Sequence, residues 1–179
     1  MTSIGNVYGE ALYSLACEEN LSQEILQELG ALEQSFSQES AFLPLLDAPN
    51  LTKEERCQVL DDCFRGKIHG YVLNFLKILA EKSYARHFGD CCAAFRNRYN
   101  EDNGILPVTA VTAVALSESQ QTALSQKLAA VTGKTIQLYN RVDETVLGGI
   151  RLDYNNTRLD DTLAHRLRDI RAKLKETVL

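Results

Sequence analysis

Hydrophobic residues recur at three- and four-residue steps through the first hundred positions, the spacing that places side chains on one face of an α-helix. Six such segments follow one another with short polar breaks, and the fifth is the most apolar. They predict helices at about 3–19, 22–36, 42–46, 52–64, 71–81 and 88–101. Because helices joined by short connections pack against their neighbours, the segments predict an all-α bundle over residues 1–104.

The hydrophobic pattern changes after residue 104. Residues 105–115 are rich in Val and Thr and alternate in polarity, which is typical of a strand. A helix follows, from a cap at about Ser117 to a stop at Gly133. A last helix is expected to begin at Asp160 or Asp161, with acidic residues at its start and basic residues toward its end.

Two segments between these helices, 135–142 and 146–154, have apolar residues at every second position. Because only the polar residues 143–145 separate them, they predict a β-hairpin. The order β-α-β-β-α then predicts a small α/β domain over residues 105–179. The fold class expected for the whole chain is therefore α+β, with a six-helix bundle followed by this domain.

Gly148 and Gly149 lie inside the second strand of the predicted hairpin. Glycine within a strand usually marks either a bulge or a place where another backbone segment comes close. The sequence alone leaves both interpretations open.

The net charge of −5 is distributed unevenly. Residues 1–104 carry 9 Lys/Arg against 16 Asp/Glu, residues 105–179 carry 10 against 8, and the first 52 residues contain no Lys or Arg. An acidic first part argues against general nucleic-acid binding, since phosphate contacts need clustered cations. The basic last helix leaves a nucleic-acid adaptor as an alternative, although such residues more often form a solvated face matched to the helix dipole.

Composition places the chain among soluble globular proteins, with 45% hydrophobic and 24% charged residues. No apolar segment approaches the roughly 20 residues that a membrane span needs. The start of the chain has neither the basic and apolar regions of a secretory signal nor the arginine-rich character of a transit peptide. Five irregularly spaced cysteines indicate reduced thiols in a cytosolic compartment.

Residues that could carry chemistry do not form a recognisable constellation. The three histidines are far apart, and no H-E-x-x-H, C-x-x-C or G-x-S-x-G motif occurs. Gly133-Lys134-Thr135 follows a helix and precedes a strand, the reverse of a phosphate-binding loop. Adjacent Cys91 and Cys92 are interpreted as buried small hydrophobic residues. We therefore expect no catalytic residue, metal site or cofactor, and a protein that works by binding.

Five sequence motifs follow one another along the chain in the order found in one known family. The first, Y-G-E-A-L-Y-S-L-A at 8–16, is similar to that family's Y-A-x-A-L-F-x-L-A. The next two are N-F-L-K-I-L-A-E at 74–81 and V-T-A-V-A-L-S at 111–117. The segment 142–149 resembles V-D-x-x-L-x-G-G, and Asp160 begins a segment that resembles D-x-S-x followed by Leu. Taken together, the motifs resemble those of the delta subunit of F-type ATP synthase, whose mitochondrial counterpart is the oligomycin-sensitivity-conferring protein.

The resemblance implies a non-catalytic stator subunit that links the catalytic head to the membrane-anchored b-type stalk. Its helical domain, 1–104, would bind the N-terminal helix of an alpha subunit in a groove between the first and fifth helices. Its second domain, 105–179, would bind the stalk, with Asp143, Gly148, Gly149 and Asp160 as the family motif of that domain. The implied groove residues are Tyr8, Ala11, Leu12, Leu15, Phe75, Leu76 and Leu79.

The resemblance also implies a peripheral position at the cytoplasmic face of a bacterial plasma membrane, where the subunit is held only through the complex. It implies no nucleic-acid partner. The chain departs from the family at Gly9, where alanine is common, and at Thr162, where serine is common. It also has Ser83-Tyr84-Ala85-Arg86 where the family often has Gly-Arg. The alternative from another class is a small-molecule-binding or enzymatic α/β protein with a regulatory helical domain.

Overall fold

The chain folds into two compact units, residues 1–99 (unit 1) and 100–179 (unit 2), and each is described by itself. The structure is a computed structural model, and it describes residues 3–39, 41–48, 51–146, 148–154 and 157–162. The division falls in the last turn of a helix, whereas the sequence pattern placed the change after residue 104.

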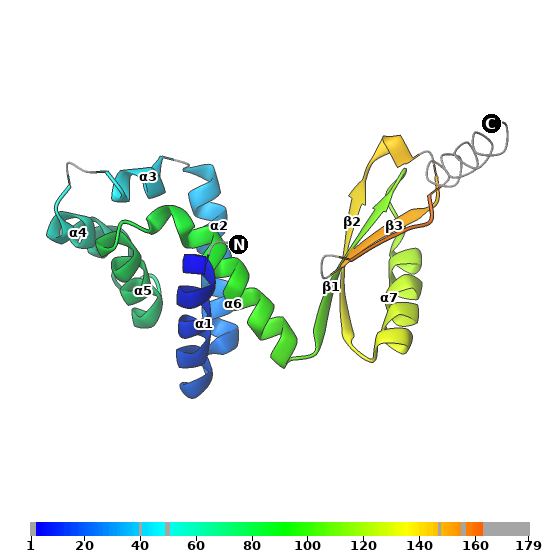
Figure 1. Cartoon of the computed structure of the whole chain (residues 1–179), viewed down its shortest axis with the longest axis horizontal. Helices are drawn as coiled ribbons and strands as arrows, with labels where there is room; N and C mark the ends of the chain where they lie inside the picture. The colour runs from blue at the N-terminus through cyan, green and yellow to red at the C-terminus, as the bar shows by residue number, and fades with distance from the viewer. Residues whose placement is uncertain (1–2, 40, 49–50, 147, 155–156, 163–179) are drawn as a thin grey trace, which may run out of the picture. The chain divides into compact units, whose positions relative to one another are not determined.

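Unit 1 is helical, and the prediction of six helices is confirmed (Figure 1). A short 3₁₀ helix, which the periodicity did not predict, precedes the sixth. The elements are α1 Ser3–Glu18, α2 Ser22–Gln38, α3 Phe42–Leu46, α4 Lys53–Phe64, α5 Gly70–Glu81, η1 Ala85–His87 and α6 Phe88–Asp102.

The core of unit 1 is organised around Phe36 of α2. Its ring stacks on Phe42 at a centroid distance of 5.2 Å, and it meets Phe88 edge-on at 5.1 Å and Phe64 at 6.0 Å. Aromatic pairs at these separations stabilise a core beyond the area they bury. One side chain thus joins α2 to α3, α4 and α6.

Two glycines allow α1 to lie unusually close to α6. A Cβ added at Gly5 would stand 2.5 Å from the Cβ of Asp90, and one added at Gly9 would stand 2.4 Å from the carbonyl oxygen of Cys91. No side chain fits at these distances, so the approach of the two helices depends on glycine at both positions.

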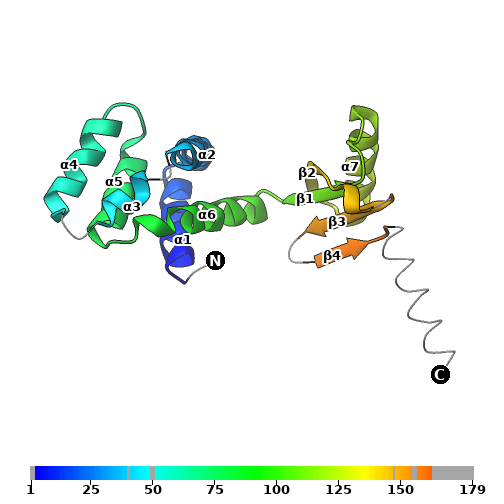
Figure 2. The same ribbon diagram turned by 90° about the horizontal axis from the view of Figure 1, so that it is seen from above.

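The described part of unit 2 contains a four-stranded mixed sheet with a helix on one side (Figures 1 and 2). The strand order is β2-β1-β3-β4. Strand β1 pairs parallel with β2 and antiparallel with β3, and β3 pairs antiparallel with β4. The elements are β1 Ile105–Thr112, α7 Glu118–Thr132, β2 Thr135–Val142, η2 Glu144–Val146, β3 Ile150–Tyr154 and β4 Thr157–Asp160.

The predicted hairpin of 135–142 with 146–154 is wrong, because β1 lies between β2 and β3. Five residues of β1 are buried, so this strand takes the centre of the sheet and pairs on both edges. Val146, assigned to the second strand, belongs to η2 and is only 4% exposed. The chain crosses the end of β1 through η2 and the two glycines before β3 begins.

Strand β4 was not predicted, and it replaces the expected start of the last helix. It is four residues long and mostly exposed, so it offers too few alternating apolar positions to be recognised. Asp160 is therefore the last residue of a strand. Most of the predicted final helix, with its basic residues, lies at 163–179, outside the described residues.

Candidate functional site

The residues implied as a partner-binding groove lie at different depths in unit 1. Leu12, Phe75, Leu76 and Leu79 belong to the core and are 1–6% exposed. Tyr8 and Leu15 are half-buried, and Ala11 is exposed. The first four would support a binding surface from below, whereas the other three are directly accessible. Replacing Leu12 or Leu76 with aspartate would therefore destabilise unit 1, and a loss of binding could then come from unfolding.

The accessible residues belong to an apolar strip along one side of α1, here called the α1 strip. It consists of Ile4, Val7, Tyr8, Ala11 and Leu15. These positions lie three and four residues apart, so their side chains follow one another along the helix beside its buried face. Val7 is 65% exposed, the highest exposure among the large hydrophobic side chains described in unit 1.

Val7 was not among the predicted groove residues. The sequence contains a signal for it, since the apolar positions of α1 cover a wider arc than a single core face requires. Nothing in that pattern shows which edge of the arc stays exposed. The structure places the buried face on Gly5, Gly9, Leu12, Tyr13 and Ala16.

Aromatic contacts place the segment after α5 beside the α1 strip. The ring of Tyr8 meets that of Tyr84 edge-on at 6.0 Å, and Tyr84 in turn lies 6.2 Å from the ring of His87. On α5 itself, Ile78 is 45% exposed. Each of the two implied helices therefore has an accessible apolar side chain, although all three residues implied on α5 are buried.

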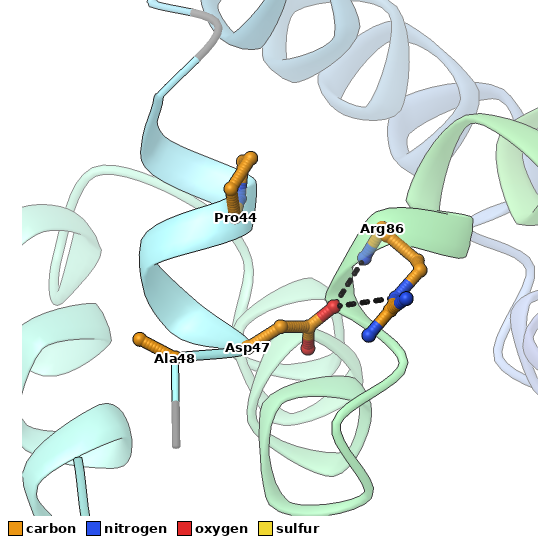
Figure 3. Close-up of a pocket in the computed structure, with 4 residues that line it drawn as sticks. All are labelled: Pro44, Asp47, Ala48 and Arg86. Atoms are coloured by element: carbon orange, nitrogen blue, oxygen red, sulfur yellow. Dashed lines mark hydrogen bonds and ion pairs between the residues drawn. The ribbon is translucent and has the colours of Figure 1, made fainter. Parts of the chain in front are cut away.

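The described pocket of unit 1 lies between α3 and η1 and is lined by Pro44, Asp47, Ala48 and Arg86 (Figure 3). The Asp47 carboxylate accepts hydrogen bonds from the backbone N–H groups of Ala85 and Arg86, both at 3.1 Å, and from Arg86 Nε at 3.2 Å. These bonds fix α3 to the start of η1. The pocket's polar groups are therefore engaged in holding the fold together.

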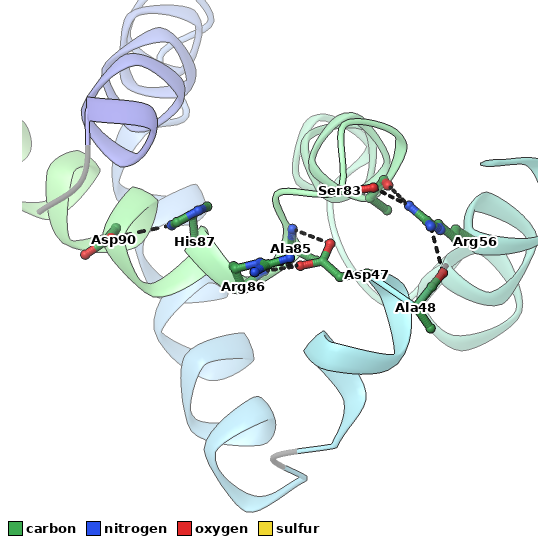
Figure 4. Close-up of polar contacts among 9 residues, drawn as sticks. Asp47, Ala48, Arg56, Ser83, Ala85, Arg86, His87 and Asp90 are labelled. Carbon is green, nitrogen blue, oxygen red and sulfur yellow. Dashed lines mark hydrogen bonds and ion pairs between the residues drawn. The ribbon is translucent and has the colours of Figure 1, made fainter. Parts of the chain in front are cut away.

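Arg56 of α4 makes a second structural junction nearby (Figure 4). It is 6% exposed and donates to the carbonyl oxygens of Ala80 at 3.0 Å and Ala48 at 2.8 Å, and to Ser83 Oγ at 2.7 Å. A cation beside the last carbonyls of α5 suits the helix dipole. Ser83 has φ 57°, a left-handed conformation that favours glycine, in the segment where the family often has Gly-Arg.

The family motif of unit 2 forms the connections around β3. Asp143 Oδ1 accepts hydrogen bonds from the backbone N–H of Thr145 at 3.0 Å and from its Oγ1 at 2.6 Å. These bonds hold the pKa of the Asp143 carboxyl below its ordinary value. Asp160 repeats the arrangement with Thr162, at 3.1 and 2.7 Å. Both aspartates thus form short turns at the ends of elements.

Gly149 occupies a place of close backbone approach, one of the two interpretations left open by the sequence. It has φ 83°, and an added Cβ would stand 2.5 Å from the carbonyl oxygen of Asp161 and 3.0 Å from the Cα of Thr162. Gly148 also has a positive φ, at 137°. The motif residues therefore bring the turn before β3 against the chain leaving β4, and the structure gives them a structural role.

The described part of the chain shows few features of a catalytic or metal-binding site. No group of three or more His, Cys, Asp or Glu residues there could hold a metal ion. Burial, assisted by nearby Asp90, raises the pKa of Cys91 to about 11, and burial also raises that of Cys92. Both thiols stay protonated and unreactive at neutral pH, so their interpretation as buried hydrophobic residues is confirmed. No described helix combines the length and apolarity that crossing a bilayer requires.

Two packed units and a partly exposed apolar strip are typical of a protein that binds other chains. The sequence matches the model of the family "ATP synthase delta (OSCP) subunit" over residues 4–174. The chain belongs to this family. As a member, it is a non-catalytic subunit of the peripheral stalk of F-type ATP synthase, so the enzymatic alternative is wrong.

Individual relatives agree with this assignment. The chain is 30% identical over 176 residues to the ATP synthase subunit delta of Clostridioides difficile, covering 98% of this chain and 97% of the relative. It is 28% identical to that of Alkaliphilus oremlandii, covering 96% of each. A chain from the Toxoplasma gondii mitochondrial ATP synthase hexamer has the same fold, with a TM-score of 0.77 at 19% identity over 97% of this chain and 98% of that one.

Proposed function

We propose that this subunit joins the catalytic head of the synthase to the membrane-anchored b-type stalk through two separate contacts. Unit 1 binds the N-terminal helix of an alpha subunit, and unit 2 binds the end of the stalk. The link resists the torque that the rotating central shaft exerts on the head, so that rotation remains coupled to ATP synthesis. Family membership supports the role in the stalk, and the α1 strip is the observation that carries the first contact.

The α1 strip has the properties of a surface for a partner helix. Val7 and Ala11 are exposed while Tyr8 and Leu15 are half-buried, so an apolar partner would remove largely hydrated surface from water. Amphipathic helices recognise such surfaces with apolar side chains spaced three and four residues apart. The proposed contact residues are Tyr8, Ala11 and Leu15, together with Val7 and Ile78.

The remaining proposed groove residues act from the core. Leu12 on α1 and Phe75, Leu76 and Leu79 on α5 are buried, and they hold the two helices in place beneath the partner. In this arrangement their contribution to affinity is indirect, through the position of the exposed residues.

Exposed apolar side chains on unit 2 support the second contact. Among the described residues of unit 2, five large hydrophobic side chains are at least 49% exposed: Val114, Val131, Tyr139, Val142 and Leu159. We place the subunit at the cytoplasmic face of a bacterial plasma membrane, attached through the complex alone. The relatives from Clostridioides difficile and Alkaliphilus oremlandii, both bacteria, support that location.

The first contact can be tested by calorimetric titration of the full chain with a synthetic peptide from the N-terminus of the same organism's alpha subunit. We expect saturable one-to-one binding. Val7→Asp should weaken it by about a hundredfold or more, because burying a carboxylate against an apolar partner costs several kcal/mol.

The matched control is Val131→Asp, which changes a valine that is 85% exposed on α7 in unit 2. This variant should bind the peptide with unchanged affinity. Circular dichroism and thermal melting establish that both variants are folded. A folded Val7→Asp variant with wild-type affinity would show that the alpha-subunit helix does not bind on the α1 strip.

A further inference from the structure

The α1 strip is bordered by carboxylates without a described counter-ion. The first 52 residues contain eight Asp or Glu and no Lys or Arg. Three of these acids are engaged elsewhere in the fold: Glu28 accepts from the backbone N–H of His69 at 2.9 Å, Glu33 pairs with Arg96, and Asp47 pairs with Arg86. Glu10, Glu18 and Glu19 are exposed, and within the described residues no ion pair joins them to a cation.

Helix geometry places these three acids around the strip. Glu10 lies three residues after Val7, Glu18 lies three residues after Leu15, and Glu19 lies four residues after Leu15. Residues three and four apart are neighbours on a helix surface. One carboxylate therefore borders the long edge of the strip, and two lie at its C-terminal end.

The distribution of charge along α1 is unfavourable for the isolated helix. Its first turn has no acidic residue and its last turn has no basic one, whereas Glu18 is its last residue and Glu19 follows directly. The carbonyl end of a helix already carries a partial negative charge, so acids there are destabilising and cations would be stabilising. The missing cations can be supplied by a partner.

We propose that the helix bound on the α1 strip carries Lys or Arg residues that meet Glu10, Glu18 and Glu19. The location of the partner rests on the proposed function, and the charge requirement goes beyond it. A second copy of this chain would bring the same carboxylates against themselves, and an anionic lipid surface would be repelled. A basic amphipathic helix combines the apolar face and the charge that the surface lacks.

The test uses the full chain and two designed helical peptides with the same apolar face. One peptide carries Lys on both flanks of that face, and the other carries Glu at the same positions. At low ionic strength the Lys peptide should bind about tenfold more tightly or better, since a few exposed ion pairs suffice for that difference. The difference should shrink as salt rises from about 10 mM to about 1 M, where the Debye length falls from ~30 to ~3 Å.

The double variant Glu18→Gln/Glu19→Gln should remove most of the preference for the Lys peptide. The matched control, Glu54→Gln/Glu118→Gln, removes two exposed carboxylates from the first turns of α4 and α7 and should leave the preference unchanged. If both peptides bind equally at low salt and Val7→Asp abolishes both, the charge requirement is overturned and the proposed function stands. If the Lys peptide binds a folded Val7→Asp variant normally, the α1 strip is not the site, and both proposals are overturned.

Discussion

At the scale of single residues, Gly9 shows why a departure from the family pattern need not weaken the fold. The family motif that residues 8–16 resemble has alanine at this position, and alanine is normally the better helix former. In this chain α6 lies so close that an added Cβ would stand 2.4 Å from the Cys91 carbonyl oxygen and 2.8 Å from the Cβ of Ala94. The obstructing oxygen belongs to the backbone, so it cannot rotate away.

We expect Gly9→Ala to destabilise unit 1 by about 1–3 kcal/mol, because overpacking outweighs the gain of up to about 1 kcal/mol in helix propensity. Gly30→Ala is the matched control. Gly30 lies inside α2 with nothing within 4 Å of an added Cβ, so this change should stabilise the protein by about 0.5–1 kcal/mol. Urea denaturation measures both, and a Gly9→Ala variant as stable as the wild type would contradict the close packing of α1 on α6.

At the scale of elements, the turns of unit 2 decide how its strands are connected. Asp143 and Asp160 each accept hydrogen bonds from the N–H and hydroxyl of a threonine two residues later. The Asp143 turn and Gly149 lie in the connection that takes the chain from β2 past the end of β1 to β3, whereas the Asp160 turn follows β4. Both turns also determine where the neighbouring strands begin and end. These contacts give the motif residues of this unit a role in its backbone geometry.

Thr145→Val should raise the pKa of Asp143 toward its ordinary value, because the variant removes the hydroxyl donor that stabilises the carboxylate. The folded-state pKa is depressed, so the stability it contributes is present above the unfolded-state pKa of about 4 and is lost as the pH falls through the folded-state value. Titration of the carboxyl ¹³C resonance by NMR measures the shift.

Thr122→Val is the control for that titration, since its hydroxyl bonds to the carbonyl oxygen of Glu118 within α7. It should leave the pKa of Asp143 unchanged. An Asp143 resonance that titrates identically in the wild type and in Thr145→Val would refute the role assigned to the hydroxyl.

At the scale of the whole molecule, the chain has two cores that share one continuous helix at their boundary. The core of unit 1 includes Phe95 of α6, which is fully buried, whereas the last turn of the same helix is grouped with unit 2. Val108 of β1 is buried in the core of unit 2. Units with separate cores can unfold separately.

We expect Phe95→Ala to reduce the stability of unit 1 by about 3–5 kcal/mol and to leave unit 2 nearly unchanged. Val108→Ala should instead reduce the stability of unit 2 and leave unit 1 nearly unchanged. The reduction should be smaller than for Phe95→Ala, because fewer atoms are removed. Residue-resolved hydrogen exchange distinguishes the two units. If either variant lowered protection in both units equally, the two cores would form one cooperative structure.

The sequence by itself determined most of the helices of this protein and how some of them begin and end. The cap at Ser117 and the helix stop at Gly133 depend on residues within a few positions of each other, and the structure confirms both, with Ser117 accepting from the backbone N–H of Gln120 and Gly133 in the left-handed conformation. The six helices of unit 1 follow from periodicity for the same reason. The five motifs, taken in their order along the chain, were also enough to identify the family, because comparing sequence motifs requires no knowledge of the three-dimensional structure.

Only the tertiary structure decided which apolar residues are accessible and how the strands are ordered. Periodicity shows that Val7 and Leu12 both lie in the apolar arc of α1, but the packing of α6 and α2 leaves Val7 exposed and buries Leu12. Likewise, β2 and β3 are adjacent in sequence, yet the buried β1 separates them. Both outcomes depend on contacts between segments that are distant in the chain. Apolar side chains from these segments compete for the same core, and the local sequence pattern does not show which of them will be buried.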